Sequence, residues 1–169
     1  MNQKSIIRRT TVSDHIKHLD TLHPVLRRVI SMRSCQYTHY QLNDLLRPDQ
    51  LLNIDIVIDR LVHHRERQSV ICIIGDYDCD GATATAVAIR GLKMLGFQQL
   101  TYLVPNRFKS GYGLSPDIVQ QSLAVDPRPD VLLTVDNGIS SIDGVACARQ
   151  ANLDVIITDH HLPGRTLPD

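Results

Sequence analysis

The chain has 169 residues, of which 43% are hydrophobic and 21% charged, and its formal net charge is zero. These values are typical of a soluble globular protein with one buried core. No apolar run approaches the roughly 20 residues of a membrane span, and the polar N-terminus lacks a signal-peptide core, so neither a membrane span nor export is expected. The four cysteines form no CxxC pair. They therefore indicate neither a zinc site nor a disulfide framework, and they suit a reducing cytoplasm.

The charges are unevenly distributed along the chain. Residues 1–68 contain 11 Lys and Arg against 7 Asp and Glu, whereas residues 69–169 contain 7 against 11. A basic segment beside an acidic domain suits a polyanionic substrate, although an imbalance of this size also arises by chance on a solvated surface. We expect a mostly helical, basic N-terminal segment over 1–68, followed by an α/β domain over 69–169.

The clearest helix pattern of the first segment lies close to its end. Apolar residues at three- and four-residue spacing predict an amphipathic helix there. These residues are Ile54, Val57, Ile58, Leu61 and Val62. Its basic end at Arg65 and Arg67 suits the negative end of a helix dipole. The neighbouring His63 and His64 are expected on the solvated face of this helix.

Predicted strands and helices alternate from residue 69 onward. Continuous apolar runs predict strands over 69–74, 100–104, 130–135 and 154–158. A loop is expected over 75–81, and helices over 82–95, 116–124 and 140–152. Ser115 and Pro116 are a capping residue and a first-turn proline, and Gly96 is typical of a helix end. This alternation predicts an α/β fold of βαβ units, with a parallel sheet covered by helices on both faces.

Three of the four predicted strands run directly into acidic or histidine clusters. These clusters are Asp76, Asp78 and Asp80 after the first strand, Asp136 after the third, and Asp159, His160 and His161 after the fourth. Because parallel strands end at one edge, the clusters should meet there, where ligands bind in open α/β sheets. So many carboxylates would repel each other unless cations neutralised them. Oxygen ligands with an added imidazole suit Mn²⁺ or Mg²⁺, and two such ions hydrolyse phosphoesters.

Each cluster taken alone has a simpler interpretation as a turn or a solvated loop. The Asp76–Gly81 segment also resembles the start of a calcium-binding loop, but the twelfth position, which requires glutamate, is Val87. It is the joint occurrence of the three clusters at strand ends that favours a metal-dependent phosphoesterase.

Four longer strings, at 74–85, 102–116, 134–141 and 157–163, resemble the DHH phosphoesterase superfamily. Within it they are similar to single-stranded-DNA-specific exonucleases of the RecJ family. The resemblance implies two Mn²⁺ or Mg²⁺ ions held by Asp78, Asp80, Asp136 and His160, with Asp136 bridging. It further implies that Asp76 and Asp159 orient ligands or water, and that His161 contacts the scissile phosphate.

The activity implied by the resemblance is metal-assisted 5′-to-3′ hydrolysis of single-stranded DNA to mononucleotides, in repair and recombination. The implied partners are single-stranded DNA, a single-strand-binding protein and a helicase. Asn106 and Arg107, just past a predicted strand end, are candidates for holding a phosphate, although the segment also reads as a surface turn.

The chain departs from this family in its length, because it stops eight residues after His161. Members of the family continue into a fourth motif with a further metal-binding aspartate and into a domain that closes the cleft. We therefore expect an N-terminal portion with an incomplete site. Two alternatives stay open, namely a non-catalytic metal- or DNA-binding remnant, and a phosphodiesterase or pyrophosphatase that acts on small substrates.

Overall fold

A computed structural model describes residues 22–32, 42–106, 108 and 110–168 of the chain. It divides into two compact units, Met1–Gln50 and Leu51–Asp169. In the first unit the described elements are helix α1 (Pro24–Met32) and the 3₁₀ turns η2 (Leu42–Asp44) and η3 (Pro48–Gln50). The second unit begins before the sheet and includes the predicted amphipathic helix, α2 (Ile54–Glu66). This helix packs with the sheet that follows it. The domain boundary at residue 68 stays a prediction.

The second unit is built on a four-stranded parallel sheet, which confirms the predicted fold class. Its strands are β1 (Ile71–Ile74), β2 (Leu100–Leu103), β3 (Val131–Val135) and β4 (Asp154–Thr158), in the order β2-β1-β3-β4. Every residue of the two central strands, β1 and β3, is buried. Burial on both faces is the physical reason for their continuous apolar runs.

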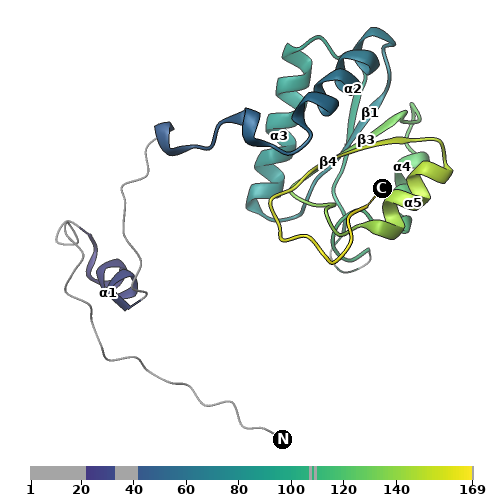
Figure 1. Cartoon of the computed structure of the whole chain (residues 1–169). Helices are drawn as coiled ribbons and strands as arrows, with labels where there is room; N and C mark the ends of the chain where they lie inside the picture. The colour runs from purple at the N-terminus through teal and green to yellow at the C-terminus, as the bar shows by residue number, and fades with distance from the viewer. Residues whose placement is uncertain (1–21, 33–41, 107, 109, 169) are drawn as a thin grey trace, which may run out of the picture. The chain divides into compact units, whose positions relative to one another are not determined.

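Helices cover both faces of this sheet, as predicted (Figure 1). On one face, α2 and α3 (Cys79–Met94) pack against a core that contains Ile73 and Leu92. On the other face, α4 (Pro116–Leu123) and α5 (Ile142–Gln150) pack against a core that contains Ile118 and Val145. Among the helices of the described ranges, none is long and apolar enough to cross a membrane.

The ends of two helices test the local predictions. Ser115 caps α4 as predicted, because its side chain accepts a hydrogen bond from the Ile118 amide at 3.3 Å. The predicted start of the preceding helix, α3, at residue 82 was wrong, since α3 begins at Cys79. The reason is Asp78, whose Oδ1 accepts a hydrogen bond from the Gly81 amide at 3.0 Å and so caps the helix inside the expected loop.

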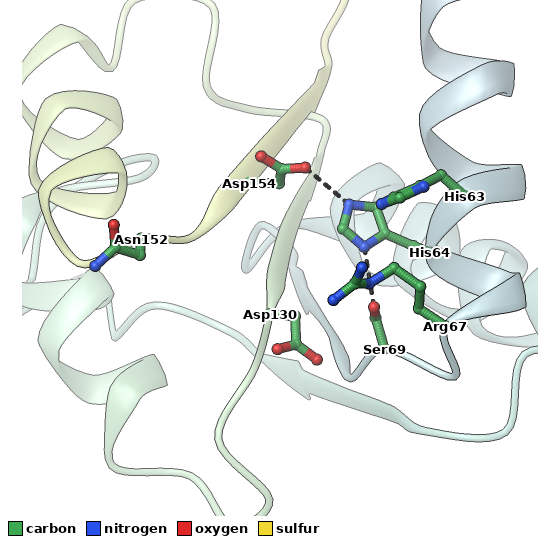
Figure 2. A pocket seen from close by; sticks show the side chains of 7 residues that line it. All are labelled: His63, His64, Arg67, Ser69, Asp130, Asn152 and Asp154. Carbon is green, nitrogen blue, oxygen red and sulfur yellow. Dashed lines mark hydrogen bonds and ion pairs between the residues drawn. The ribbon is translucent and has the colours of Figure 1, made fainter.

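The prediction that His64 lies on a solvated face was also wrong, because its side chain is buried against the start of the sheet. Figure 2 shows the imidazole between Ser69 and Asp154. Its Nε2 lies 2.8 Å from Asp154 Oδ2, and its Nδ1 lies 3.0 Å from Ser69 Oγ. Since a carboxylate only accepts, Nε2 donates to Asp154, and this bond joins α2 to β4. His63, its neighbour, is exposed as expected.

We expect His64→Ala to lower the free energy of unfolding by about 2 kcal/mol, because it removes two hydrogen bonds and leaves the buried Ser69 hydroxyl without the imidazole as its partner. The matched control is His63→Ala, which should change stability by less than about 0.5 kcal/mol. Urea unfolding followed by circular dichroism measures both. Equal effects of the two substitutions would show that the bond to Asp154 does not stabilise the fold.

Candidate metal centre

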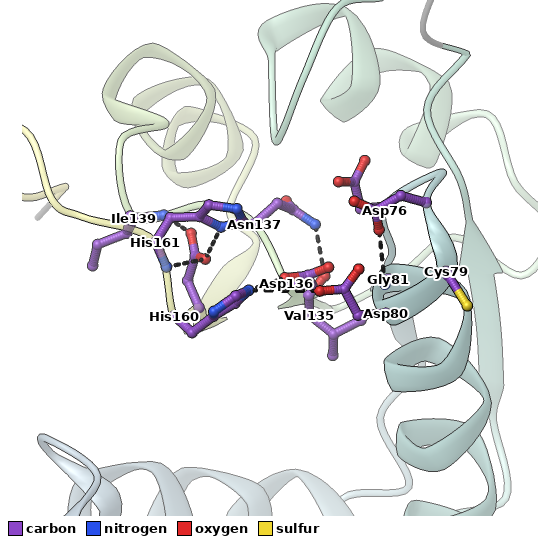
Figure 3. A network of polar contacts seen from close by, with 12 residues as sticks. Asp76, Cys79, Asp80, Gly81, Val135, Asp136, Asn137, Ile139, His160 and His161 are labelled. Atoms are coloured by element: carbon purple, nitrogen blue, oxygen red, sulfur yellow. Dashed lines mark hydrogen bonds and ion pairs between the residues drawn. The ribbon is translucent and has the colours of Figure 1, made fainter. Parts of the chain in front are cut away.

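The carboxyl ends of three neighbouring strands, β1, β3 and β4, bring the predicted clusters to one edge of the sheet. Side chains from all three strand ends converge in Figure 3, with Asp136 between His160 on one side and Asp80 on the other. The strand order explains this meeting, because β3 lies between β1 and β4. The sequence prediction of a shared edge is therefore confirmed.

Asp136 has the most unusual environment of the cluster. Its side chain is only 6% exposed, yet neither carboxylate oxygen has a hydrogen-bond partner among the described residues. His160 Nε2 lies 2.8 Å from Oδ1, which is an ion-pair distance, but this contact is not a hydrogen bond. The residue also has a left-handed backbone, with φ of 64°, which is uncommon outside glycine. A buried carboxylate without donors is costly unless a cation compensates it, so this residue fits a metal ligand.

Two groups of side chains in the described part of the chain have the spacing to hold a metal ion, and Asp136 belongs to both. One group combines Asp136 with Asp76 and Asp78, the other with His160 and His161, and within each group the ligand atoms lie within 4.8 Å of one another. Asp80 belongs to neither group, although its Oδ2 lies 3.9 Å from His160 Nε2. Asp136 is therefore the residue through which the two groups are joined.

Two of the three aspartates that follow β1, Asp76 and Asp78, differ in environment. Asp76 is buried, and this burial raises the pKa of its carboxyl, aided by the nearby charges of Asp78 and Asp136, although the Tyr77 amide at 2.7 Å opposes the shift. Asp78 is exposed, and the Gly81 amide of the helix cap holds its pKa below the usual range. A Cβ on Gly81 would lie 2.5 Å from Asp76 Cβ, so only glycine lets α3 begin so close to this aspartate.

Asp159 holds the second histidine in place. Its side chain is 1% exposed and accepts hydrogen bonds from the backbone amides of Ile139 at 2.9 Å and His161 at 3.1 Å. It also lies 2.7 Å from His161 Nδ1. Burial would raise the pKa of Asp159, but these hydrogen bonds together hold it below its ordinary value. The contact with Asp159 in turn raises the pKa of His161.

Sequence reasoning missed two residues of this edge. Asn137 is fully buried, and its Nδ2 donates to the carbonyl oxygens of Ile74 at 3.0 Å and Val135 at 2.9 Å, which joins the ends of β1 and β3. Tyr112 places its hydroxyl against both Asp136 and His161. Both residues lie within the strings that carry the family resemblance. The sequence around Asn137 has the pattern of a turn, and Tyr112 has no partner close to it in sequence.

Of the two residues predicted to hold a phosphate, Asn106 and Arg107, the structure describes only Asn106. Asn106 is exposed, and its Oδ1 accepts a hydrogen bond from the Phe108 amide at 3.0 Å, as in a tight turn. Arg107 lies outside the described residues. The phosphate-binding role of this pair therefore stays a prediction.

Comparison with known proteins gives consistent results. The model of the DHH family, N-terminal domain, matches residues 70–169. The chain is 44% identical over 149 residues to the single-stranded-DNA-specific exonuclease RecJ of Haemophilus influenzae, covering 86% of this chain and 26% of that protein. It is 40% identical over 171 residues to the protein of the same name from Escherichia coli, covering 99% of this chain and 29% of the relative.

Two solved structures resemble the fold. One is a crystal structure of exonuclease RecJ bound to manganese, with a TM-score of 0.65 and 34% identity over 74% of this chain and 31% of that one. The other is RecJ in complex with Mn²⁺ from Thermus thermophilus, with a TM-score of 0.61 and 31% identity over 75% of this chain and 17% of that one. The chain thus spans less than a third of the length of these relatives. On the match over 70–169 and the edge cluster at its strand ends, the chain belongs to the DHH family.

Proposed function

We propose that this chain supplies metal-binding residues of an exonuclease that hydrolyses single-stranded DNA from its 5′ end to mononucleotides, in repair and recombination. The observation that carries the proposal is Asp136, a buried carboxylate without a hydrogen-bond donor among the described residues that is common to two ligand groups. The similarity to exonucleases of this name supports the substrate class. A cytoplasmic location and the partners, a single-strand-binding protein and a helicase, are proposed on the family resemblance.

In this proposal the ligands of two Mn²⁺ or Mg²⁺ ions are Asp78, Asp80, Asp136 and His160. Asp78 uses Oδ1 for the helix cap, so Oδ2 is the oxygen proposed to bind an ion. Asp80 and His160 are largely exposed and approach from opposite sides of Asp136 (Figure 3). When bound, a pair of ions activates water at neutral pH and stabilises the charge on the attacking and leaving oxygens.

The remaining residues of the cluster orient these ligands and the substrate. Asp76 is buried next to the cap of α3, where it could accept a hydrogen bond from bound water. Asp159 fixes the ring of His161, which is 46% exposed and therefore accessible to a phosphate. Asn106 and Arg107, on the loop after β2, are the proposed contacts for a further phosphate.

The test is a single-stranded oligonucleotide labelled at either end and incubated with the chain and Mn²⁺. The proposal predicts that a 5′ label appears first in mononucleotide, whereas a 3′ label stays in progressively shortened strands. Asp136→Ala should abolish hydrolysis of both oligonucleotides. Equal release from both ends, or release that survives Asp136→Ala, would refute it. Hydrolysis of pyrophosphate or a dinucleotide but not of the oligonucleotide would support the small-substrate alternative instead.

A second candidate, metal binding without turnover, is favoured by one feature of the cluster. Each ligand group offers only three ligand atoms, and the two groups have one carboxylate in common. Such a cluster could hold one ion well and a second ion poorly. Mn²⁺ binding that depends on Asp136 without hydrolysis of any phosphoester would support this candidate.

A further inference from the structure

We propose that Tyr112 is a positioning residue of the metal centre, whose hydroxyl fixes the backbone of Asp136 and the ring edge of His161. The inference rests on the proposed function, because it assigns Tyr112 to the same site. In this role Tyr112 supplies neither a charge nor a nucleophile for hydrolysis. Its role is to hold two groups, from different strand ends, in one arrangement.

The contacts of the tyrosine hydroxyl carry the inference. Its oxygen lies 2.9 Å from the backbone carbonyl oxygen of Asp136 and 3.0 Å from His161 Nδ1. The two rings meet edge to face, with centroids 5.6 Å apart and an interplanar angle of 77°. A tyrosine hydroxyl carries its proton at neutral pH, because the ordinary pKa of this side chain is about 10. The hydroxyl is therefore a donor with one proton and two available lone pairs.

The proton positions in this network follow from what each partner can do. The carboxylate of Asp159 only accepts, and it lies 2.7 Å from His161 Nδ1, so Nδ1 carries a proton. A protonated Nδ1 cannot accept from Tyr112. The tyrosine proton must therefore go to the Asp136 carbonyl, and the tyrosine oxygen is a second acceptor, beside Asp159, for the Nδ1–H. The other ring nitrogen, Nε2, lies 3.5 Å from the hydroxyl and remains available for the phosphate contact proposed above.

The backbone around Tyr112 explains how it reaches this position. It stands between Gly111 and Gly113, which both have positive φ angles of 73° and 77°, a conformation that side chains rarely adopt. The next residue, Leu114, donates its amide to Ser141 Oγ at 3.2 Å, which ties the segment to the start of α5. The loop from β2 thus presents one aromatic side chain to the ends of β3 and β4.

The carbonyl that Tyr112 binds belongs to the residue with the left-handed backbone. The amide of Asp136 donates a hydrogen bond to the Thr158 carbonyl at 3.0 Å. With Tyr112 on the carbonyl, both polar backbone groups of Asp136 are hydrogen-bonded. Loss of one such bond corresponds to about 1 kcal/mol, or about a fivefold change in an equilibrium constant.

The experiment compares Tyr112→Phe, which keeps the ring contact but removes the hydroxyl, with the parent chain. Tyr102→Phe on β2, also an exposed tyrosine, is the matched control. NMR of the metal-free chain follows the backbone carbonyl carbon of Asp136 and the Nδ1–H of His161. Calorimetry then measures the dissociation constant of Mn²⁺ for each variant.

We expect Tyr112→Phe to shift the Asp136 carbonyl resonance, to broaden the His161 Nδ1–H signal by faster solvent exchange, and to raise the Mn²⁺ dissociation constant about fivefold. Tyr102→Phe should change none of these. Spectra of Tyr112→Phe that match the parent, or an unchanged Mn²⁺ affinity, would overturn the inference. If the parent chain bound no Mn²⁺, the proposed function would fail, while the spectra would still decide whether Tyr112 orients the two groups.

Discussion

Replacing Asp136 by alanine should raise the dissociation constant of Mn²⁺ at least about 100-fold, a larger effect than any other single substitution in the cluster. Removing partners that only orient a ligand costs about 10- to 100-fold in metal affinity, and loss of a shared ligand should exceed that. Asp136 belongs to both ligand groups, so both lose a carboxylate at once. Calorimetry with Mn²⁺ measures the effect, and Asp59→Ala, on an exposed position of α2, is the control.

The same substitution should have the opposite effect on the metal-free fold. The parent chain buries a carboxylate whose oxygens have no hydrogen-bond partner among the described residues, and alanine removes that desolvated charge. Without Mn²⁺ we therefore expect Asp136→Ala to raise the free energy of unfolding by about 1–3 kcal/mol. An Asp136→Ala chain that bound Mn²⁺ like the parent, or was less stable without metal, would contradict the assignment of this residue.

The 169-residue chain by itself should release mononucleotides from single-stranded DNA at less than about 0.01 per second, two orders of magnitude below the slow end of typical enzymes. Hydrolysis by two ions requires both ions at a short separation and a fixed phosphate, and positioning accounts for roughly 7–11 kcal/mol of such barriers. Two ligand groups with a common carboxylate satisfy only part of that requirement. Loss of a third of the positioning term would slow turnover about 100-fold.

The rate is measured with excess 5′-labelled oligonucleotide and saturating Mn²⁺, and Asp136→Ala reports contaminating nuclease. Turnover of about 1 per second or faster that disappears in Asp136→Ala would show that these residues suffice for catalysis. Adding separately expressed C-terminal segments of a relative offers a gain-of-function version of the same measurement.

The strands and the clusters that follow them could be predicted from local patterns, because burial on two faces and parallel pairing leave a direct mark on the sequence. The runs at β1 and β3 and the cap at Ser115 are such cases. The same reasoning predicted that Asp136 and His160 lie at one edge. Their spacing to within a few ångströms depends on strand register, which the sequence does not encode locally.

The errors concern residues whose role is set by distant partners. His64 has the local context of a solvated helix face, and only the arrival of Asp154, 90 residues later, makes it a buried residue. Asp78 was expected within a metal-binding loop over 75–81, but its side chain also caps α3. The predicted start of α3 was therefore three residues too late. Tyr112 received no role because its partners come from two other strand ends.

The bond between His64 and Asp154 also has a consequence for the order of events in folding. It closes a loop of 90 residues, so its entropic cost is high until β1 and β3 have already paired. We therefore expect this contact to form after the folding transition state, with a φ-value near zero for His64→Ala. His64 then contributes little to how quickly the domain folds and much to how slowly it unfolds, so this histidine prolongs the lifetime of the folded state.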